Sequence, residues 1–105
     1  MTVVSVLVAA MFASAAATHH DYWHLVVGMW QGPRHVRGFF ASGEFVLDPE
    51  AQGARGGGWK IVGDHLLIRY PGDESFTPER IIAITATKLT TESNGARYTW
   101  TRIEH

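Results

Sequence analysis

The spacing of its turn signals is the feature that most limits how this chain can fold. From Leu25 onward, short runs rich in β-branched and aromatic residues alternate with breaks, of which Gly32-Pro33, Gly63-Asp64 and Asn94-Gly95 are the clearest. Strands separated by turns at intervals of about 8–12 residues are typical of an all-β sandwich or barrel. Because hairpin loops need few residues, we expect a small antiparallel up-and-down barrel, closed or partly open, of about seven to eight short strands.

The individual strands follow from the runs between the breaks. We predict them at residues 25–31, 35–41, 44–48, 59–62, 65–70, 79–85, 88–92 and 97–103. Residues 18–24 are expected to include a short turn, and the glycine-rich stretch Pro49–Gly58 is expected to be a loop. Asn94-Gly95 is the strongest hairpin signal, because both residues tolerate positive φ.

An uncharged apolar run, Val3–Ala17, precedes this region. The run is short for a membrane-spanning helix, which needs about 20 residues. It ends in Ala15-Ala16-Ala17, a small-residue cleavage pattern, although no Lys or Arg precedes it. We therefore predict a signal peptide at residues 1–17, one domain at 18–105, and a periplasmic or extracellular location. A buried N-terminal helix of the domain is the alternative.

Export gives a direct prediction about the mature protein. Residues 1–17 should be missing from protein secreted by the native host, because signal peptidase cuts after small-residue patterns of this kind. Intact-mass measurement checks this expectation. A mass that still includes residues 1–17 would contradict it.

The composition excludes several kinds of site. The chain contains no cysteine, so disulfides, thiolate metal sites and a cysteine-linked lipid anchor are ruled out. The formal net charge is −1, which provides no electrostatic footprint for nucleic acid. Once the signal peptide is removed, we expect no membrane span. No serine–histidine–aspartate grouping or supported carboxylate pair is recognisable, so we predict no catalytic residues and no enzymatic activity.

The histidines offer one candidate metal site, at the start of the mature chain. His20 and His24 could share one helical face, with His19 and Asp21 beside them, and such groups can ligate Zn²⁺ or Cu²⁺. The alternative is a solvated terminus without metal. Because no strong ligand spacing such as His-Glu-x-x-His is present, we predict neither a metal site nor a cofactor.

The order of the motifs resembles that of the small bacterial lipocalin-like proteins. Gly28-x-Trp30 lies on the first predicted strand, followed by the run Gly58–Leu66, then Thr87-Lys88-Leu89, and finally Tyr98-x-Trp100-x-Arg102. In lipocalins, a late arginine packs over the first-strand tryptophan at the closed end of the barrel. The resemblance therefore implies a structural motif of Gly28, Trp30 and Arg102, and a function in binding small molecules.

Strand alternation predicts which side chains face the interior. The inward set is Trp30, Phe45, Trp59, Leu66, Ile68, Tyr70, Ile82, Leu89, Tyr98 and Trp100. Its aromatic members are the candidate ligand-binding residues: Trp30, Phe45, Trp59, Tyr70, Tyr98 and Trp100. An eight-stranded barrel is wide enough either to be filled by side chains or to hold one small ligand, and with so many rings we favour a filled core.

Three functions remain in competition. The first is an exported binding protein that holds a small apolar ligand or a partner in or at the mouth of the barrel. The second is a periplasmic or extracellular interaction module with a solid core, such as an inhibitor of a secreted enzyme. The third is a secreted enzyme, which would require a cluster of titratable residues at the barrel mouth.

Overall fold

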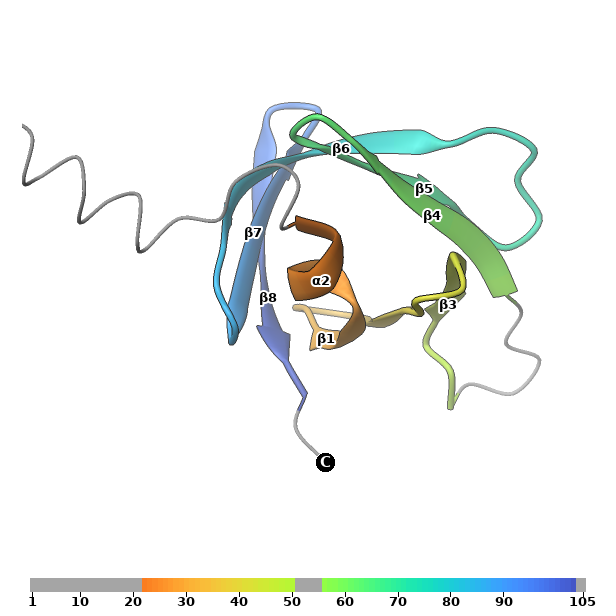
Figure 1. Ribbon diagram of the computed structural model, residues 1–105, viewed down its shortest axis with the longest axis horizontal. Helices are drawn as coiled ribbons and strands as arrows, with labels where there is room; N and C mark the ends of the chain where they lie inside the picture. Colours follow the sequence, from red (N-terminus) through yellow and green to blue (C-terminus); the bar gives the residue numbers. More distant parts are fainter. Residues whose placement is uncertain (1–21, 51–55, 104–105) are drawn as a thin grey trace, which may run out of the picture.

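The computed structural model describes residues 22–50 and 56–103, and in this part of the chain eight antiparallel strands close into an up-and-down barrel (Figure 1). The elements are α2 (Tyr22–Val26), β1 (Gly28–Gln31), β2 (Val36–Phe39), β3 (Glu44–Leu47), β4 (Gly56–Val62), β5 (His65–Arg69), β6 (Thr77–Ile84), β7 (Lys88–Ser93) and β8 (Ala96–Arg102). The all-β barrel predicted from the turn spacing is therefore confirmed.

Each strand pairs with the next one in sequence, and β1 pairs with β8 to close the barrel. The closing ladder is short, because β1 has four residues and only Trp30 and Gln31 find partners, Arg102 and Thr101. Beyond Gln31 the chain turns away into the β1–β2 connection. The part of β8 from Ala96 to Trp100 therefore pairs with β7 alone.

The starts of β1 and β4 differ from the prediction by three residues, and the other strand boundaries by two at most. Leu25 and Val26 belong to α2, where the buried Val26 carbonyl accepts a hydrogen bond from Trp30 Nε1 at 2.8 Å. The run Gly56–Gly58 belongs to β4, where it pairs with β3. A Cβ on Gly57 would lie 1.9 Å from the Arg69 carbonyl oxygen, so the close approach of β5 requires glycine there.

A β-bulge in β6 changes which isoleucines reach the core. The register of β6 against β7 shifts between Ile81 and Ala83. An extra residue in one strand moves the following side chains to the other face. As a result Ile81 and Ile84 are buried, whereas Ile82 is only partly buried and stands outside the core. The prediction that Ile82 faces inward is therefore wrong.

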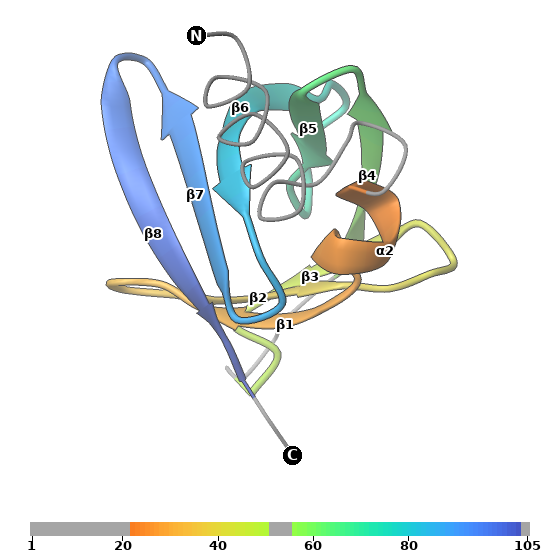
Figure 2. The same cartoon turned by 60° about the vertical axis from the view of Figure 1, so that its left-hand side comes forward.

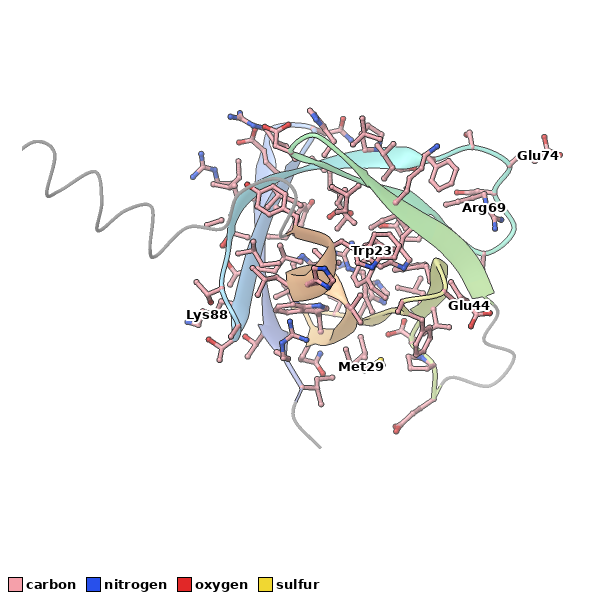
Figure 3. The ribbon with its side chains drawn as sticks, viewed as in Figure 1. Trp23, Met29, Glu44, Arg69, Glu74 and Lys88 are labelled. Atoms are coloured by element: carbon pink, nitrogen blue, oxygen red, sulfur yellow. The ribbon has the colours of Figure 1, made fainter. Side chains whose placement is uncertain are left out.

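One end of the barrel is closed by α2, which leads directly into β1 at the end that carries the β2–β3, β4–β5 and β6–β7 turns. The α2 helix lies across the space between β7–β8 and β3–β4 (Figures 1 and 2). Its Trp23 points into the interior (Figure 3) and stacks on Trp59, with ring centroids 4.0 Å apart. These rings and the buried core beneath them fill this half of the barrel.

At the closed end, Arg102 packs over Trp30, as the resemblance to lipocalins implied. Its guanidinium carbon lies 4.3 Å from the centre of the Trp30 ring. The same guanidinium donates hydrogen bonds to the carbonyl oxygens of Ala86, Val27 and Leu25. Gly28 makes room for it, because a Cβ at that position would lie 2.2 Å from Arg102 Nη1, and its φ of +136° also favours glycine.

The β7–β8 hairpin has the turn predicted from Asn94-Gly95, with φ values of 53° and 80°. Gly95→Val should lower the free energy of unfolding by about 1–3 kcal/mol, because a β-branched residue is strained at positive φ. No atom would crowd the new Cβ, so the loss would report backbone strain alone. Urea unfolding checks this, with Ala96→Val as the control on the neighbouring residue. Equal stability of the two variants would contradict the turn assignment.

The predicted signal peptide and the interval 51–55 lie outside the described residues. Within residues 22–50 and 56–103, the structure contains no helix with the length and apolar character needed to span a membrane.

Candidate functional site

A cavity of about 680 Å³ opens at the end of the barrel opposite α2. One side of its rim is formed by the β1–β2 connection, at Pro33, Arg34 and His35, and the other by the β7–β8 hairpin, at Ser93, Asn94 and Ala96. These two segments flank the stretch of β8 that lacks a partner in β1. The short β1 strand therefore leaves the barrel open at this end.

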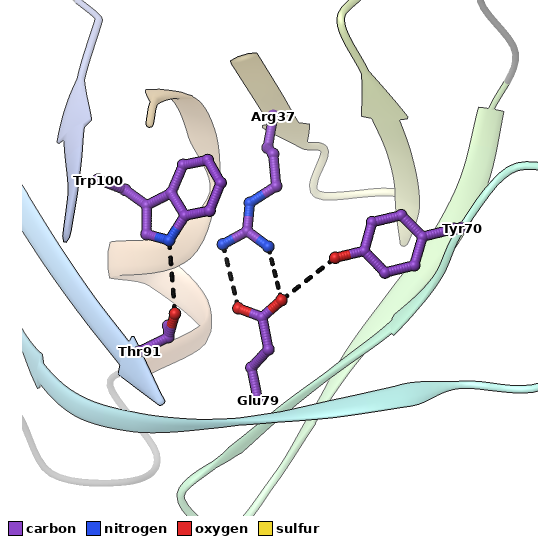
Figure 4. A network of polar contacts seen from close by, with 5 residues as sticks. All are labelled: Arg37, Tyr70, Glu79, Thr91 and Trp100. Carbon is purple, nitrogen blue, oxygen red and sulfur yellow. Dashed lines mark hydrogen bonds and ion pairs between the residues drawn. The ribbon is translucent and has the colours of Figure 1, made fainter. Parts of the chain in front are cut away.

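A buried ion pair forms part of the cavity lining. Arg37 Nη1 donates to Glu79 Oε2 at 2.8 Å, and Arg37 Nη2 donates to Glu79 Oε1 at 3.2 Å. The side chains come from β2 and β6, and the two residues are only 1% and 6% exposed. Figure 4 shows the two carboxylate oxygens facing the two guanidinium nitrogens, with the Tyr70 hydroxyl beside one of these oxygens. This bidentate geometry fixes both charges in the barrel interior.

Aromatic rings surround the ion pair. The Arg37 guanidinium carbon lies 3.6 Å from the centre of the Trp100 ring and 5.4 Å from that of Phe39. The Trp100 indole N–H donates to the Thr91 hydroxyl at 3.4 Å (Figure 4). Gly32 lies directly against the Trp100 ring, since a Cβ there would be 2.2 Å from it. Trp100 is thus held between the β1–β2 connection and the buried cation.

Tyr70 connects the ion pair to the wall of the barrel. Its hydroxyl donates to Glu79 Oε2 at 3.2 Å, and its ring meets Phe45 edge to face at 5.4 Å. Burial raises the pKa of the Tyr70 phenol, and the negative charge of Glu79 raises it further. Tyr70 therefore stays protonated and acts as a hydrogen-bond donor at neutral pH.

A second polar pair fixes the rim. Asp48 accepts hydrogen bonds from the Val36 backbone N–H at 2.9 Å and from the His35 ring at 2.6 Å. The Val36 hydrogen bond, together with that from His35, lowers the pKa of the Asp48 carboxyl. The pair anchors the start of β2 and so positions His35 at the mouth of the cavity.

The structure divides the predicted ligand-binding residues into two groups. Tyr70, Tyr98 and Trp100 line the cavity, and Tyr98 remains 41% exposed on the inner face of β8. The other three, Trp30, Phe45 and Trp59, are buried in the hydrophobic core. The first group stays a candidate binding surface, and the second group is placed where it supports the fold.

The residues that sequence reasoning missed are Arg37 and Glu79. A usable signal was present, because Arg37 alternates with Phe39 along one strand and Glu79 alternates with Ile81 along another. Both charged residues therefore occupy positions that strand alternation assigns to the inner face. They were passed over because charged side chains are rarely fully buried unless they are paired.

The Arg37–Glu79–Tyr70 network is a cluster of titratable groups in the cavity lining, below the mouth where an enzyme was expected to need one. Its chemistry favours a fixed polar surface instead. The two Glu79 oxygens already accept three hydrogen bonds, and the raised pKa of Tyr70 makes it a weaker acid. The network is therefore a set of hydrogen bonds already formed in the cavity wall.

The candidate metal ligands are not brought together in the described part of the chain. His24 is exposed on α2, and residues 19–21 lie outside the described residues. Within the described ranges, no group of three or more histidine or acidic side chains is arranged to hold a metal ion.

Comparison of the chain with protein-family models, curated proteins and solved structures finds no significant match.

Proposed function

We propose that this protein is an exported, lipocalin-like binding protein that holds a small molecule in the cavity at the open end of its barrel. The observation that carries the proposal is the asymmetry between the two ends. One end is closed by α2, Trp23 and Arg102, while the other opens into about 680 Å³ of space beside Trp100. Small-molecule sites are typically concave and about 300–1,000 Å³ in volume.

The lining supports this proposal by its chemistry. Pockets for small molecules combine apolar and aromatic walls with a few fixed polar groups that orient the ligand. Tyr98 and Trp100 supply the aromatic surface here, and the Arg37–Glu79 pair supplies the fixed polar groups. Both partners of that pair are held before any ligand enters, so little further ordering would be needed on binding.

The interaction module with a solid core remains the second candidate, because the closed half of the barrel is filled by its own side chains. Such a module would act through its loops and would not need the cavity. Filling the cavity should therefore leave its function intact, which separates the two candidates.

The binding proposal is tested with N-phenyl-1-naphthylamine, a neutral probe whose fluorescence rises in an apolar site. The wild-type protein should bind about one molecule of probe. Ala96→Trp should abolish the signal, because Ala96 lines the cavity and the indole would occupy the mouth. Thr99→Trp is the matched control, since Thr99 is exposed on the outer face of β8.

Equal loss of probe binding in both variants, or no saturable binding by the wild type, would reject the cavity as the site. Thermal unfolding of the two variants shows that each remains folded. Binding lost in Ala96→Trp and retained in Thr99→Trp would support the proposal.

A further inference from the structure

We propose that the cavity selects small amphipathic acids, molecules with a flat apolar body and one carboxylate. This inference rests on the proposed function and adds the chemical class of the ligand. It follows from three properties of the lining, which are its hydrogen-bonding capacity, its charge and its shape.

The first property is an unsatisfied donor. Glu79 accepts from both Arg37 Nη atoms and from the Tyr70 hydroxyl, so each of its oxygens already has a donor. Arg37 Nε is different, because among the described residues it is the one buried side-chain nitrogen or oxygen without a hydrogen-bond partner. Buried donors nearly always have an acceptor. The group that is still needed beside Arg37 is therefore an acceptor such as a carboxylate oxygen.

The second property is the charge of the lining. Arg34, Arg37 and Glu79 all line the cavity, and the Glu79 charge is already matched by Arg37. Arg34 is exposed at the rim and has no ion-pair partner within the described ranges. Among the residues that line the cavity, the uncompensated charge is therefore that of Arg34, which is positive. Such a mouth attracts anions and disfavours cations.

The third property is the shape of the aromatic surface. Trp100 is already in contact with Gly32 and with the Arg37 guanidinium. Tyr98 lies two residues before it on the same face of β8 and keeps 41% of its surface exposed. An offset or edge-to-face contact with this ring favours a flat partner. A planar body packed against Tyr98 would place its carboxylate between the rim and the buried guanidinium.

Three naphthalene derivatives of similar size provide the test, namely 2-naphthoate, neutral 2-naphthamide and the 2-naphthylmethylammonium cation. Each is measured by its displacement of N-phenyl-1-naphthylamine from the full-length mature protein. The acid should bind about tenfold more tightly than the amide, since hydrogen bonds to ionised groups are about twice as strong as neutral ones. The cation should bind most weakly. Added salt should narrow these differences, because exposed charges such as Arg34 are screened.

Two variants assign the preference to the open end. Arg34→Gln should reduce the difference between acid and amide several-fold. Lys88→Gln is the control, because it removes the same charge from an exposed residue at the start of β7, near the closed end. An equal effect of both variants would attribute the preference to overall charge and would overturn the assignment.

The Arg37 Nε–H resonance reports on the buried donor without any mutation. Saturation with 2-naphthoate should shift this signal downfield, because the N–H gains a charged acceptor. A signal that stays unchanged at saturation would overturn the role of Arg37. If the amide or the cation binds as tightly as the acid, the ligand class is wrong and the binding function stands. If neither the naphthalene derivatives nor the neutral probe bind, both proposals are rejected.

Discussion

Trp30→Ala should lower the free energy of unfolding by about 3–5 kcal/mol, because it removes a fully buried indole from the core. The same change deletes the ring beneath Arg102 and the hydrogen bond from the indole to the Val26 carbonyl. Urea unfolding measures the loss. Gln31→Ala is the control on the same strand, where the side chain is exposed and the expected effect is within about 0.5 kcal/mol.

The double-mutant cycle with Arg102→Ala tests whether the two residues close the barrel together. Arg102→Ala alone should cost about 2–3 kcal/mol, because it removes charged hydrogen bonds to three carbonyl groups. Since the side chains are in contact, the two losses should be non-additive by about 0.5–3 kcal/mol. Losses that add within error would mean that the stacking contributes nothing to closure.

Glu79→Ala should be the second large destabilisation, about 3–5 kcal/mol, because it leaves Arg37 buried without its counter-charge. Replacing both partners, as Arg37→Met with Glu79→Leu, should recover most of this loss, since well-packed apolar residues can substitute for a buried pair. The comparison is Glu92→Ala, which breaks the surface ion pair with Arg97 and should cost about 0–1 kcal/mol.

If Glu79→Ala is as stable as the wild type, the assignment of a buried ion pair in the barrel interior is contradicted. The assignment is also contradicted if the double variant, Arg37→Met with Glu79→Leu, is less stable than Glu79→Ala. The double variant also separates stability from binding. It should fold, but it should no longer bind 2-naphthoate more tightly than 2-naphthamide.

Much of the fold could be predicted from the sequence, because turns and strand alternation are local properties. Asn94-Gly95 marks a hairpin through backbone preferences of the two residues themselves, and the strands around it follow from β-branched and aromatic runs. The contact between Trp30 and Arg102 could also be anticipated, but only from the resemblance, since the residues lie at opposite ends of the domain.

The remaining features depend on neighbours that are distant in sequence. Gly56–Gly58 reads as a loop by composition and becomes a strand because β3 and β5 approach it closely. The β6 bulge is set by its pairing with β7, and it brings both Ile81 and Ile84 to the core while Ile82 stands outside it. The helix over Leu25 and Val26 forms against the barrel end, where Trp30 and Arg102 bind its carbonyls.

Only part of the candidate site could be predicted from the sequence, because the rest depends on contacts between residues that are distant in sequence. Tyr70, Tyr98 and Trp100 could be selected as inward-facing aromatic residues, and they do line the cavity. Arg37 and Glu79 are 42 residues apart, and each alone looks like a solvated charge. Their burial becomes reasonable only when β2 and β6 face each other across the closed barrel.

The most direct test of small-molecule binding at the open end is a backbone ¹H–¹⁵N NMR titration with N-phenyl-1-naphthylamine. We predict that the largest shifts fall on Ser93, Asn94, Tyr98 and Trp100, while Gly43, Gly63 and Thr87 at the closed end stay nearly unchanged. Shifts centred on the closed end, or no shift at saturating probe, would contradict the assignment of the open-end cavity as the binding site.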